Sequence, residues 1–211
     1  MPINVYTHGR RDEAKVALTF DDGPNPPCTD DILKILLAGQ ARATFFVIGK
    51  WVERWPDAVD RIVQAGHIIG NHSYSHDQVN GDFDRAEEVI RNRTARPSVF
   101  IRAPYFSSQL YPGSQVATHP GVRLVHADVV PDDWSLSGPH EIISRVLQNS
   151  NLKGGAIIDL HDGSEREAER LARPSAMISA LPQLIDELKS RGYSLVGLDE
   201  MELVEPTQLS G

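Results

Sequence analysis

The sequence predicts an α/β fold with a largely parallel sheet. Two observations lead to this class: apolar runs rich in β-branched residues alternate with helix-like segments along the whole chain, and polar clusters follow several of the apolar runs. With 211 residues the chain is long enough for one sizeable core, and no repeat, low-complexity stretch or flexible linker divides it. We therefore expect a single domain over residues 1–211.

Seven apolar segments predict strands, because they are rich in β-branched and aromatic residues and are bounded by Gly, Pro or polar residues. In chain order they cover residues 15–20, 43–48, 67–70, 98–101, 122–127, 155–160 and 193–198. Five of them lead into polar clusters. Because the carboxyl ends of parallel strands meet at one edge of a barrel-like sheet, these clusters are expected to form one site.

Five helices are predicted between these strands. Thr29 or Asp30 is a typical N-cap for the first helix, which ends near Gly39, and Pro56 and Pro139 stand where proline commonly opens a helix. The helices are expected to cover residues 29–39, 56–66, 82–95, 139–149 and 174–191.

Charge and cysteine content narrow the classes of partner. The 29 acidic residues exceed the 21 Lys and Arg, and the formal charge of −8 disfavours nucleic acid or an anionic membrane surface as a partner. The single cysteine, Cys28, excludes an intrachain disulfide and a multi-cysteine zinc site. No run approaches membrane-spanning length, and no signal-like segment opens the chain. We expect a monomer that is cytoplasmic as the chain stands, or secreted if a signal peptide has been removed.

Two polar clusters indicate a divalent-metal site. Asp21 and Asp22 follow the first apolar run, and His72 and His76 follow the third. Two His residues four apart can place both imidazoles on one side of a helical turn, and one carboxylate completes a three-ligand site with an open position. The second carboxylate is then free to act as a base toward water. The alternatives without a metal are an ordinary Asp-Gly-Pro turn and a pair of histidines that is either solvated or part of the core.

Other polar residues at strand ends have both a structural and a catalytic interpretation. His161 either caps the sheet or donates a proton to the leaving group of an acyl hydrolysis. Arg102 either makes a surface ion pair or holds the expected base ionised. Pro104 and Tyr105 form a plain turn, or the Tyr105 amide donates to an oxyanion. Trp134 is a core residue or lines a sugar or acyl pocket.

Together these residues resemble the polysaccharide deacetylase family, the NodB homology domain of carbohydrate esterase family 4. The similarity covers roughly residues 15–198 and implies a distorted (β/α) barrel of about seven parallel strands. All five motif positions of the family occur in order. They are Thr19-Phe20-Asp21-Asp22-Gly23, His72-Ser73-Tyr74-Ser75-His76, Arg102-Ala103-Pro104-Tyr105, Asp133-Trp134 and residues 158–161.

The resemblance implies a role for each motif. Asp21 would be the catalytic base, oriented by Arg102, and His161 would be the general acid. One divalent ion would be bound by Asp22, His72 and His76; zinc is the default on ligand type, and cobalt or nickel would accept the same ligands. Contacts to the oxyanion or the substrate would come from the last three motifs, through Pro104, Tyr105, Asp133, Trp134, Ile158 and Leu160.

The fourth motif departs from the family pattern. The family has an Asp three residues before the Asp-Trp pair, where it supports the catalytic His, and this position is Val130 here. Either Asp128 or Asp132 substitutes for it, or His161 has no carboxylate partner. A histidine without such a partner has a lower pKa and a less defined orientation.

The third and fifth motifs depart at positions that bear on the substrate. Ile158 stands where Leu is common, as a pocket residue for the acetyl methyl, and Asp159 interrupts an apolar strand. Tyr105 is followed by Phe106 rather than by the frequent Gly. The loop of residues 107–120 is expected to govern which sugar, which chain length and which acetyl linkage the protein accepts.

The predicted function is metal-dependent hydrolysis of acetyl groups from carbohydrate. N-deacetylation of N-acetylglucosamine-containing glycans, such as chitooligosaccharide or peptidoglycan, is preferred over O-deacetylation of acetylxylan. One alternative is an amidohydrolase of the same superfamily that acts on a small non-sugar amide, which Val130 and the missing signal peptide favour. A second is a carbohydrate-binding relative without turnover. Acetate release from glycans distinguishes the deacetylase from both alternatives.

Overall fold

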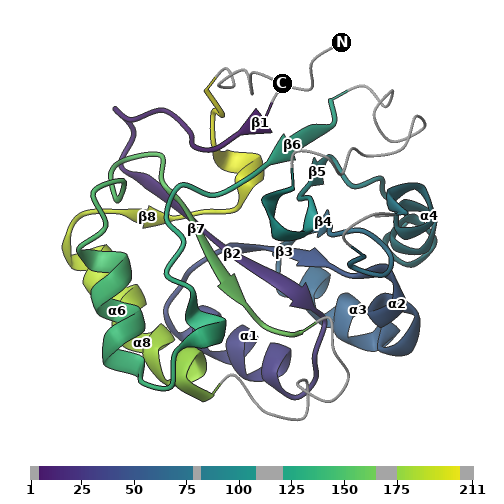
Figure 1. Ribbon diagram of the computed structural model, residues 1–211, viewed down its shortest axis with the longest axis horizontal. Helices are drawn as coiled ribbons and strands as arrows, with labels where there is room; N and C mark the ends of the chain where they lie inside the picture. Colours follow the sequence, from purple (N-terminus) through teal and green to yellow (C-terminus); the bar gives the residue numbers. More distant parts are fainter. Residues whose placement is uncertain (1–4, 78–81, 108–120, 165–174, 205–211) are drawn as a thin grey trace.

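A curled parallel sheet forms the centre of the computed structural model, which describes residues 5–77, 82–107, 121–164 and 175–204. All pairings between the named strands are parallel. The strand order is β1-β6-β5-β4-β3-β2-β7, and β8 pairs with the start of β2 (Figure 1). The strands are β1 (Val5–Tyr6), β2 (Lys15–Gly23), β3 (Ala43–Val47), β4 (Ile68–Asn71), β5 (Phe100–Ile101), β6 (Arg123–Val125), β7 (Ile157–His161) and β8 (Ser194–Leu195).

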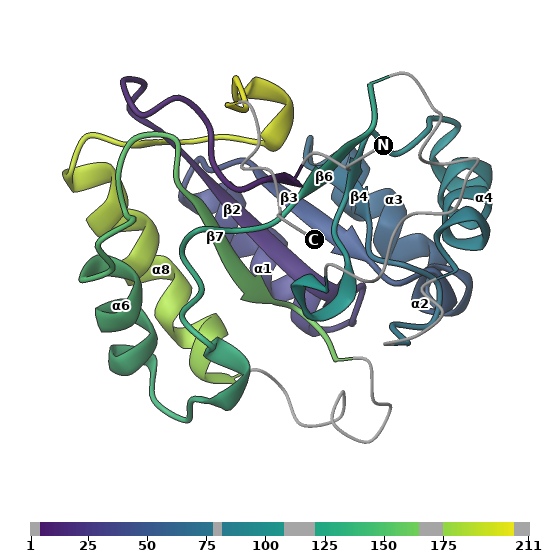
Figure 2. The ribbon, with the colours of Figure 1, turned by 45° about the horizontal axis from the view of Figure 1, so that its top comes forward.

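Helices pack along the outside of the sheet (Figures 1 and 2). They are α1 (Cys28–Ala38), α2 (Gly49–Arg54), α3 (Pro56–Gln64), α4 (Phe83–Thr94), α6 (Pro139–Leu147) and α8 (Ser175–Ser190). The helices α6 and α8 pack against each other, α1 contacts α8, and α2, α3 and α4 form a group at the other end of the sheet. Within the described ranges, no helix is long and apolar enough to cross a membrane.

The predicted parallel α/β architecture is confirmed, and each expected strand and helix occurs with shifted ends. The main shift is at β2, which continues to Gly23 and so contains both carboxylates that were expected to follow it. Sequence patterns missed β1 and α2, because elements of two and six residues are too short to show a period. The expected start of the last helix at residue 174 lies outside the described residues.

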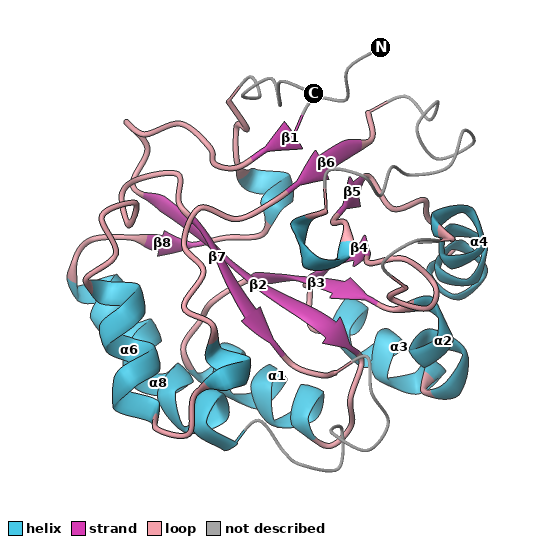
Figure 3. Cartoon of the chain, in the orientation of Figure 1, coloured by secondary structure: helices cyan, strands magenta, loops and turns pink. Residues whose placement is uncertain are grey.

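Contacts beyond the strand ends curl the sheet into an open half-barrel. Val129, which follows β6, forms a parallel bridge with Ile158 of β7, although β6 and β7 lie near opposite ends of the strand order. His8, which follows β1, forms a bridge with Ala156, which precedes β7. The segment after β6 is therefore brought beside the carboxyl end of β7. Figure 3 shows that the loops after β2 and β7 leave the sheet at the same end.

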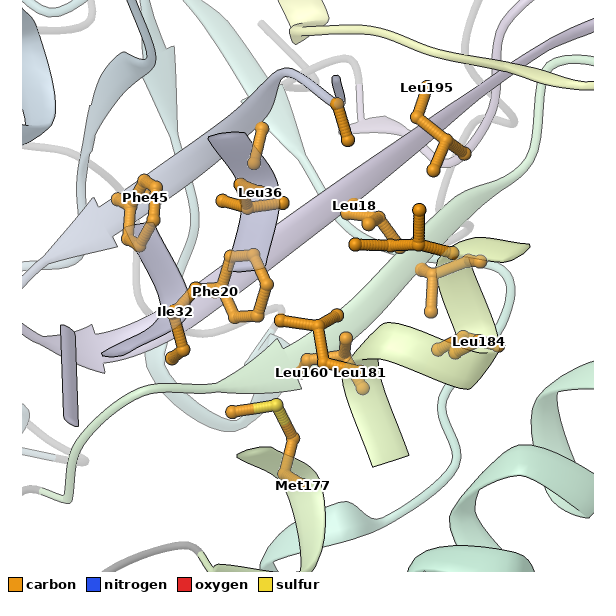
Figure 4. Packing of buried hydrophobic residues seen from close by; sticks show 14 of the residues in the cluster. Leu18, Phe20, Ile32, Leu36, Phe45, Leu160, Met177, Leu181, Leu184 and Leu195 are labelled. Carbon is orange, nitrogen blue, oxygen red and sulfur yellow. The ribbon is translucent and has the colours of Figure 1, made fainter. Parts of the chain in front are cut away.

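The outer side of β2 and β7 carries the main hydrophobic core. Val16, Leu18 and Phe20 of β2 pack in one fully buried cluster with Ile158 and Leu160 of β7. Side chains from α1 and α8 complete this cluster (Figure 4). Because side chains alternate along a strand, the intervening residues of both strands face the inside of the curl.

The inner side changes from apolar to polar along the same two strands. Toward the amino ends of β2 and β7, the inner side contributes to a smaller buried cluster that includes Ala17, Phe46 and Ile157. Toward the carboxyl ends it carries polar groups. The inner positions pair across the two strands as Ala17–Ile157, Thr19–Asp159 and Asp21–His161. The strand register therefore places the polar residues of both strands side by side.

Neighbouring leucines of α1 give a matched test of the core. Leu36 is fully buried in the main cluster, whereas Leu37 is 79% exposed. We expect Leu36→Ala to lower the free energy of unfolding by about 2–5 kcal/mol, because it removes buried methyl groups and leaves a cavity. Leu37→Ala should change it by less than about 0.5 kcal/mol. Urea denaturation followed by circular dichroism measures both, and equal losses would contradict this packing.

Candidate active site

The carboxyl ends of the strands bring the predicted polar residues together. Asp21 and Asp22 lie at the end of β2, and His72 follows β4 directly. Arg102 follows β5, and His161 is the last residue of β7. The expectation that the polar clusters share one edge of a parallel sheet is confirmed by these positions.

A β-bulge places the two adjacent carboxylates of β2 on the same side. Neighbouring residues of a regular strand point to opposite faces. Here the register of β2 with β3 shifts between Asp21 and Gly23, and Asp22 has a positive φ of 71°. The bulge turns the Asp22 side chain away from the core side. As a result, Asp22 Oδ1 lies 3.4 Å from His72 Nε2, and Asp21 Oδ2 lies 3.5 Å from the same nitrogen.

The two histidines are held by a loop, so the expected helical turn is wrong. Ser73 and His76 both have positive φ, of 65° and 62°, which interrupts helical geometry. The loop is fixed instead by side chains: Asn71 Oδ1 accepts a hydrogen bond from the Ser73 amide at 2.9 Å, and Ser73 Oγ accepts one from the His76 amide at 3.0 Å. These bonds replace the backbone bonds of a helix and direct both imidazoles inward.

Three buried ligand atoms converge in a way that fits a metal ion. The Nε2 atoms of His72 and His76 are 3.2 Å apart, and Asp22 Oδ1 lies 3.1 Å from that of His76. His72 Nδ1 lies 2.8 Å from the Arg102 carbonyl, which only accepts hydrogen bonds, so Nδ1 carries the proton and Nε2 offers a lone pair. Asp22 Oδ1 is buried and receives no well-aligned hydrogen bond from the described residues. Two imidazoles and a carboxylate form a donor set that zinc and similar ions accept.

A completely buried arginine fixes the second carboxylate of β2. Arg102 Nη1 donates to Asp21 Oδ1 at 2.7 Å, to Thr19 Oγ1 at 2.8 Å and to Asp159 Oδ1 at 2.9 Å. The guanidinium carbon lies 4.2 Å above the centre of the Phe46 ring. The expected contact between Arg102 and Asp21 is therefore present, and the alternative of a surface ion pair is wrong.

Asp159 belongs to this site although its sequence pattern did not predict it. Its side chain is 4% exposed, and it faces the inside of the curl beside Thr19 of β2. Burial and the charge of Asp21 raise the pKa of Asp159 to about 7, while the charge of Arg102 acts in the opposite direction. One available signal was the inward position of a carboxylate within a buried strand, because such a group requires a charged partner.

His161 has a carboxylate partner, which corrects the expectations drawn from Val130. His161 Nδ1 lies 2.8 Å from Asp133 Oδ1, and the His161 amide donates to Asp133 Oδ2 at 3.0 Å. Burial lowers the pKa of His161, but the charges of Asp133 and Asp159 outweigh burial and hold this pKa well above its ordinary value.

Neither of the two proposed substitutes supports His161. The Asp128 carboxylate pairs with Arg11 at 2.5 Å, and that of Asp132 pairs with Arg145 at 3.2 Å. Asp133 reaches His161 because the chain after β6 returns to β7. This return places the short helix η2 (Asp133–Ser135) against the end of β7. Asp133 was expected to contact the substrate, and the structure directs its carboxylate to His161 instead.

The remaining predicted residues separate into an exposed and a buried group. Tyr105, in the short helix η1 (Pro104–Phe106), is 53% exposed, and its ring lies 4.7 Å from that of His76. Trp134 is 69% exposed, and Pro104 is buried. Ile158 and Leu160, expected to line a substrate pocket, are instead fully buried in the main core. The reason is strand alternation, which points them away from Asp159 and His161. In the loop expected to select substrate, residues 108–120 lie outside the described residues.

The chain is similar in sequence to proteins of one family. A sequence profile described as polysaccharide deacetylase matches residues 8–120. The chain is 36% identical over 203 residues to a chitooligosaccharide deacetylase of Bradyrhizobium sp. (strain ANU 289), which covers 88% of this chain and 90% of the relative. It is 32% identical over 200 residues to a peptidoglycan-N-acetylglucosamine deacetylase of Bacillus cereus, with coverages of 90% and 88%.

Solved structures share the fold. The Bc1960 peptidoglycan N-acetylglucosamine deacetylase superposes with a TM-score of 0.81 at 31% identity, over 96% of this chain and 95% of that one. A CE4 family pseudoenzyme from Bacillus anthracis also reaches 0.81, at 23% identity over 95% of this chain and 69% of that one, a likeness of fold alone. The profile match over more than half of the sequence and the identities to full-length relatives lead to one conclusion: the chain belongs to the polysaccharide deacetylase family.

Proposed function

We propose that the protein is a metal-dependent deacetylase that releases acetate from N-acetylglucosamine-containing glycans. The observation that carries this proposal is the convergence of Asp22, His72 and His76 next to a separately held carboxylate, Asp21. The names of the relatives, chitooligosaccharide and peptidoglycan deacetylases, support the N-acetyl sugar as the substrate. Because a pseudoenzyme has the same fold, the proposal depends on the residues of the site rather than on the architecture.

One divalent ion would be held by Asp22, His72 and His76. Zinc suits these donors, and cobalt and nickel accept the same set. When bound, such an ion polarises a carbonyl group and lowers the pKa of water. The hydrogen bond from His72 Nδ1 to the Arg102 carbonyl keeps the ligating nitrogen of His72 directed at the site.

Asp21 would take the proton of the attacking water. Its Oδ1 is held by Arg102, while its Oδ2 faces the histidine cluster. The ion pair with Arg102 fixes the orientation of the Asp21 carboxylate. Its Oδ2 is therefore already directed toward the position of the attacking water.

His161 would protonate the departing amine nitrogen. Asp133 occupies its Nδ1, which leaves Nε2 as the atom that holds the transferable proton. The raised pKa of His161 keeps the imidazole protonated at neutral pH, as a general acid requires. The proposed products are acetate and the free amino sugar.

Two exposed aromatic residues would contact the sugar. Trp134 follows the Asp133 that supports His161, and Tyr105 contacts the ring of His76. Both therefore border the site while their rings remain accessible. An aromatic ring offers an apolar face to a pyranose ring, and the Tyr105 amide is our candidate donor to the oxyanion.

Removal of metal tests the proposed function. Treatment with a chelator should abolish acetate release from N-acetylchitooligosaccharides, and zinc, cobalt or nickel should restore it, because the proposed chemistry requires a Lewis acid. His72→Ala and His76→Ala should lose bound metal, measured by elemental analysis, and lose activity by at least about a hundredfold. The exposed His140 provides the matched control, since His140→Ala should keep both.

Several results would contradict the proposal. Undiminished acetate release from demonstrably metal-free protein would exclude metal dependence. Stoichiometric metal without acetate release from glycans would exclude the glycan deacetylase, and hydrolysis of small amides would then identify the alternative amidohydrolase. Acetylated xylan, assayed in parallel, distinguishes O-deacetylation from N-deacetylation.

The partner of His161 generates a pH prediction. Asp133→Asn removes a negative charge that favours the imidazolium, so the pKa of His161 should fall toward its ordinary value. The reaction needs protonated His161, and kcat/KM therefore falls as pH rises through this pKa. The alkaline limb of the pH profile should move to lower pH in the variant. NMR titration of the imidazole measures the pKa directly.

The adjacent acidic residue supplies the control for this measurement. Asp132 pairs with Arg145 rather than with His161, so Asp132→Asn should leave both the titration and the alkaline limb in place. An unchanged pKa of His161 in Asp133→Asn would show that the contact has no electrostatic effect.

Trp134 gives a test of substrate contact. Trp134→Ala should raise KM for chitooligosaccharides about two- to tenfold, the range expected from roughly 0.5–1.5 kcal/mol of aromatic contact, with kcat little changed. Val130 lies in the same segment and is also partly exposed, so Val130→Ala is the control that should leave KM unchanged. An unaltered KM in Trp134→Ala would remove this residue from the sugar site.

A further inference from the structure

A buried carboxylate, Asp159, lies beside the base, and so far it has entered the mechanism only through its charge, which helps to raise the pKa of His161. Asp159 Oδ1 accepts a hydrogen bond at 2.9 Å from the same Arg102 nitrogen that donates to Asp21. Arg102 is fully buried, and both carboxylates are about 4% exposed. One guanidinium group therefore serves two carboxylates in a region from which water is largely excluded.

Charge balance explains why Arg102 needs Asp159 in addition to Asp21. A buried charge without a counter-ion is strongly unfavourable. In the reaction, one O–H bond of water breaks and its proton moves to Asp21, which neutralises this carboxylate. Apart from Asp159, Arg102 would then have only neutral acceptors, namely Thr19 Oγ1 and the carbonyl oxygens of Val125 and His126.

We propose that Asp159 is a positioning residue that remains the counter-ion of Arg102 while Asp21 holds the proton. The inference rests on the proposed deacetylation for its catalytic consequence, although the charge pairing stands independently of the reaction. Through its hydrogen bond to Arg102 Nη1, Asp159 keeps the guanidinium paired and in place for the return of the charge.

The electrostatic surroundings of Asp159 agree with this role. The charged groups that face it are Asp21 of β2, Arg102 after β5, Asp133 of η2 and His161 of its own strand. Burial and the Asp21 charge bring the pKa of Asp159 to about 7. Since the negative charge of Asp21 contributes to this rise, neutralisation of Asp21 favours the ionised form of Asp159. Negative charge is thereby available to Arg102 in either state of the base.

Kinetics test the catalytic part of the proposal. Asp159→Asn keeps the shape and one acceptor oxygen but removes the charge. We expect kcat for acetate release to fall by about tenfold or more, with KM within about twofold, because the loss concerns proton acceptance rather than sugar binding. In an Asp21→Asn background, the same substitution should cause no further loss of kcat. Independent, multiplicative losses would overturn the proposal.

Asp128 provides a matched control for this substitution. It is a largely buried carboxylate that pairs with an arginine, Arg11, and accepts a hydrogen bond from the Ile157 amide of β7 at 2.9 Å. Asp128→Asn should leave kcat and KM within about twofold, even if it lowers the melting temperature. An equal loss of kcat in Asp128→Asn and Asp159→Asn would show a general effect of destabilising β7, and would overturn the assignment.

Folding stability tests the charge pairing without reference to activity. Asp21→Asn reproduces the neutral base, and either single variant leaves Arg102 one counter-ion. The double variant leaves none, so its folding equilibrium constant should fall by at least about tenfold more than the product of the two single effects. Urea denaturation of the full chain, with and without zinc, measures this coupling. Additive effects would refute the pairing even if the enzyme deacetylates glycans, whereas strong coupling in a protein that releases no acetate would refute only the proposed function.

Discussion

The site depends on the burial of one arginine. Among the described residues, Arg102 is the largest fully buried side chain, and its guanidinium bonds to residues of β2 and β7 and to carbonyl groups at the end of β6. Its main chain also supports the candidate metal site: its amide donates to the Asn71 carbonyl, and its carbonyl accepts from His72. One residue thus fixes both a carboxylate and an imidazole of the candidate metal site, because its charge must be satisfied where water cannot reach.

Much of the fold and the grouping of the candidate ligands was predictable from the sequence, because both are recorded in local patterns. Apolar β-branched runs mark strands whatever their partners are, and the carboxyl ends of parallel strands gather at one edge by geometry alone. The pairs Asp21-Asp22 and His72-x-x-x-His76 therefore pointed to the candidate metal ligands without knowledge of strand order. The contact between Arg102 and Asp21 was also predictable, since an arginine at the same edge as two carboxylates has an obvious partner.

The failures concern features that depend on tertiary closure. The partner of His161 was sought at positions 128, 130 and 132, and the true partner, Asp133, is selected by a bridge between Val129 and β7 that leaves no mark in local sequence. The loop geometry around His72 arises from positive φ values and side-chain bonds rather than from periodicity. Ile158 and Leu160 were placed by motif position, and strand alternation sends them to the core instead.

The alternation of β2 and β7 has a consequence for how such a protein can change. Successive residues of one strand serve the hydrophobic core and the polar site in turn, as Leu18, Thr19, Phe20 and Asp21 do. A one-residue insertion or deletion in either strand would exchange the two sets, placing carboxylates in the core and leucines in the site. Evolution or engineering of a new specificity is therefore confined to substitutions within these strands and to length changes in the loops that follow them, where chain can be added without altering strand register.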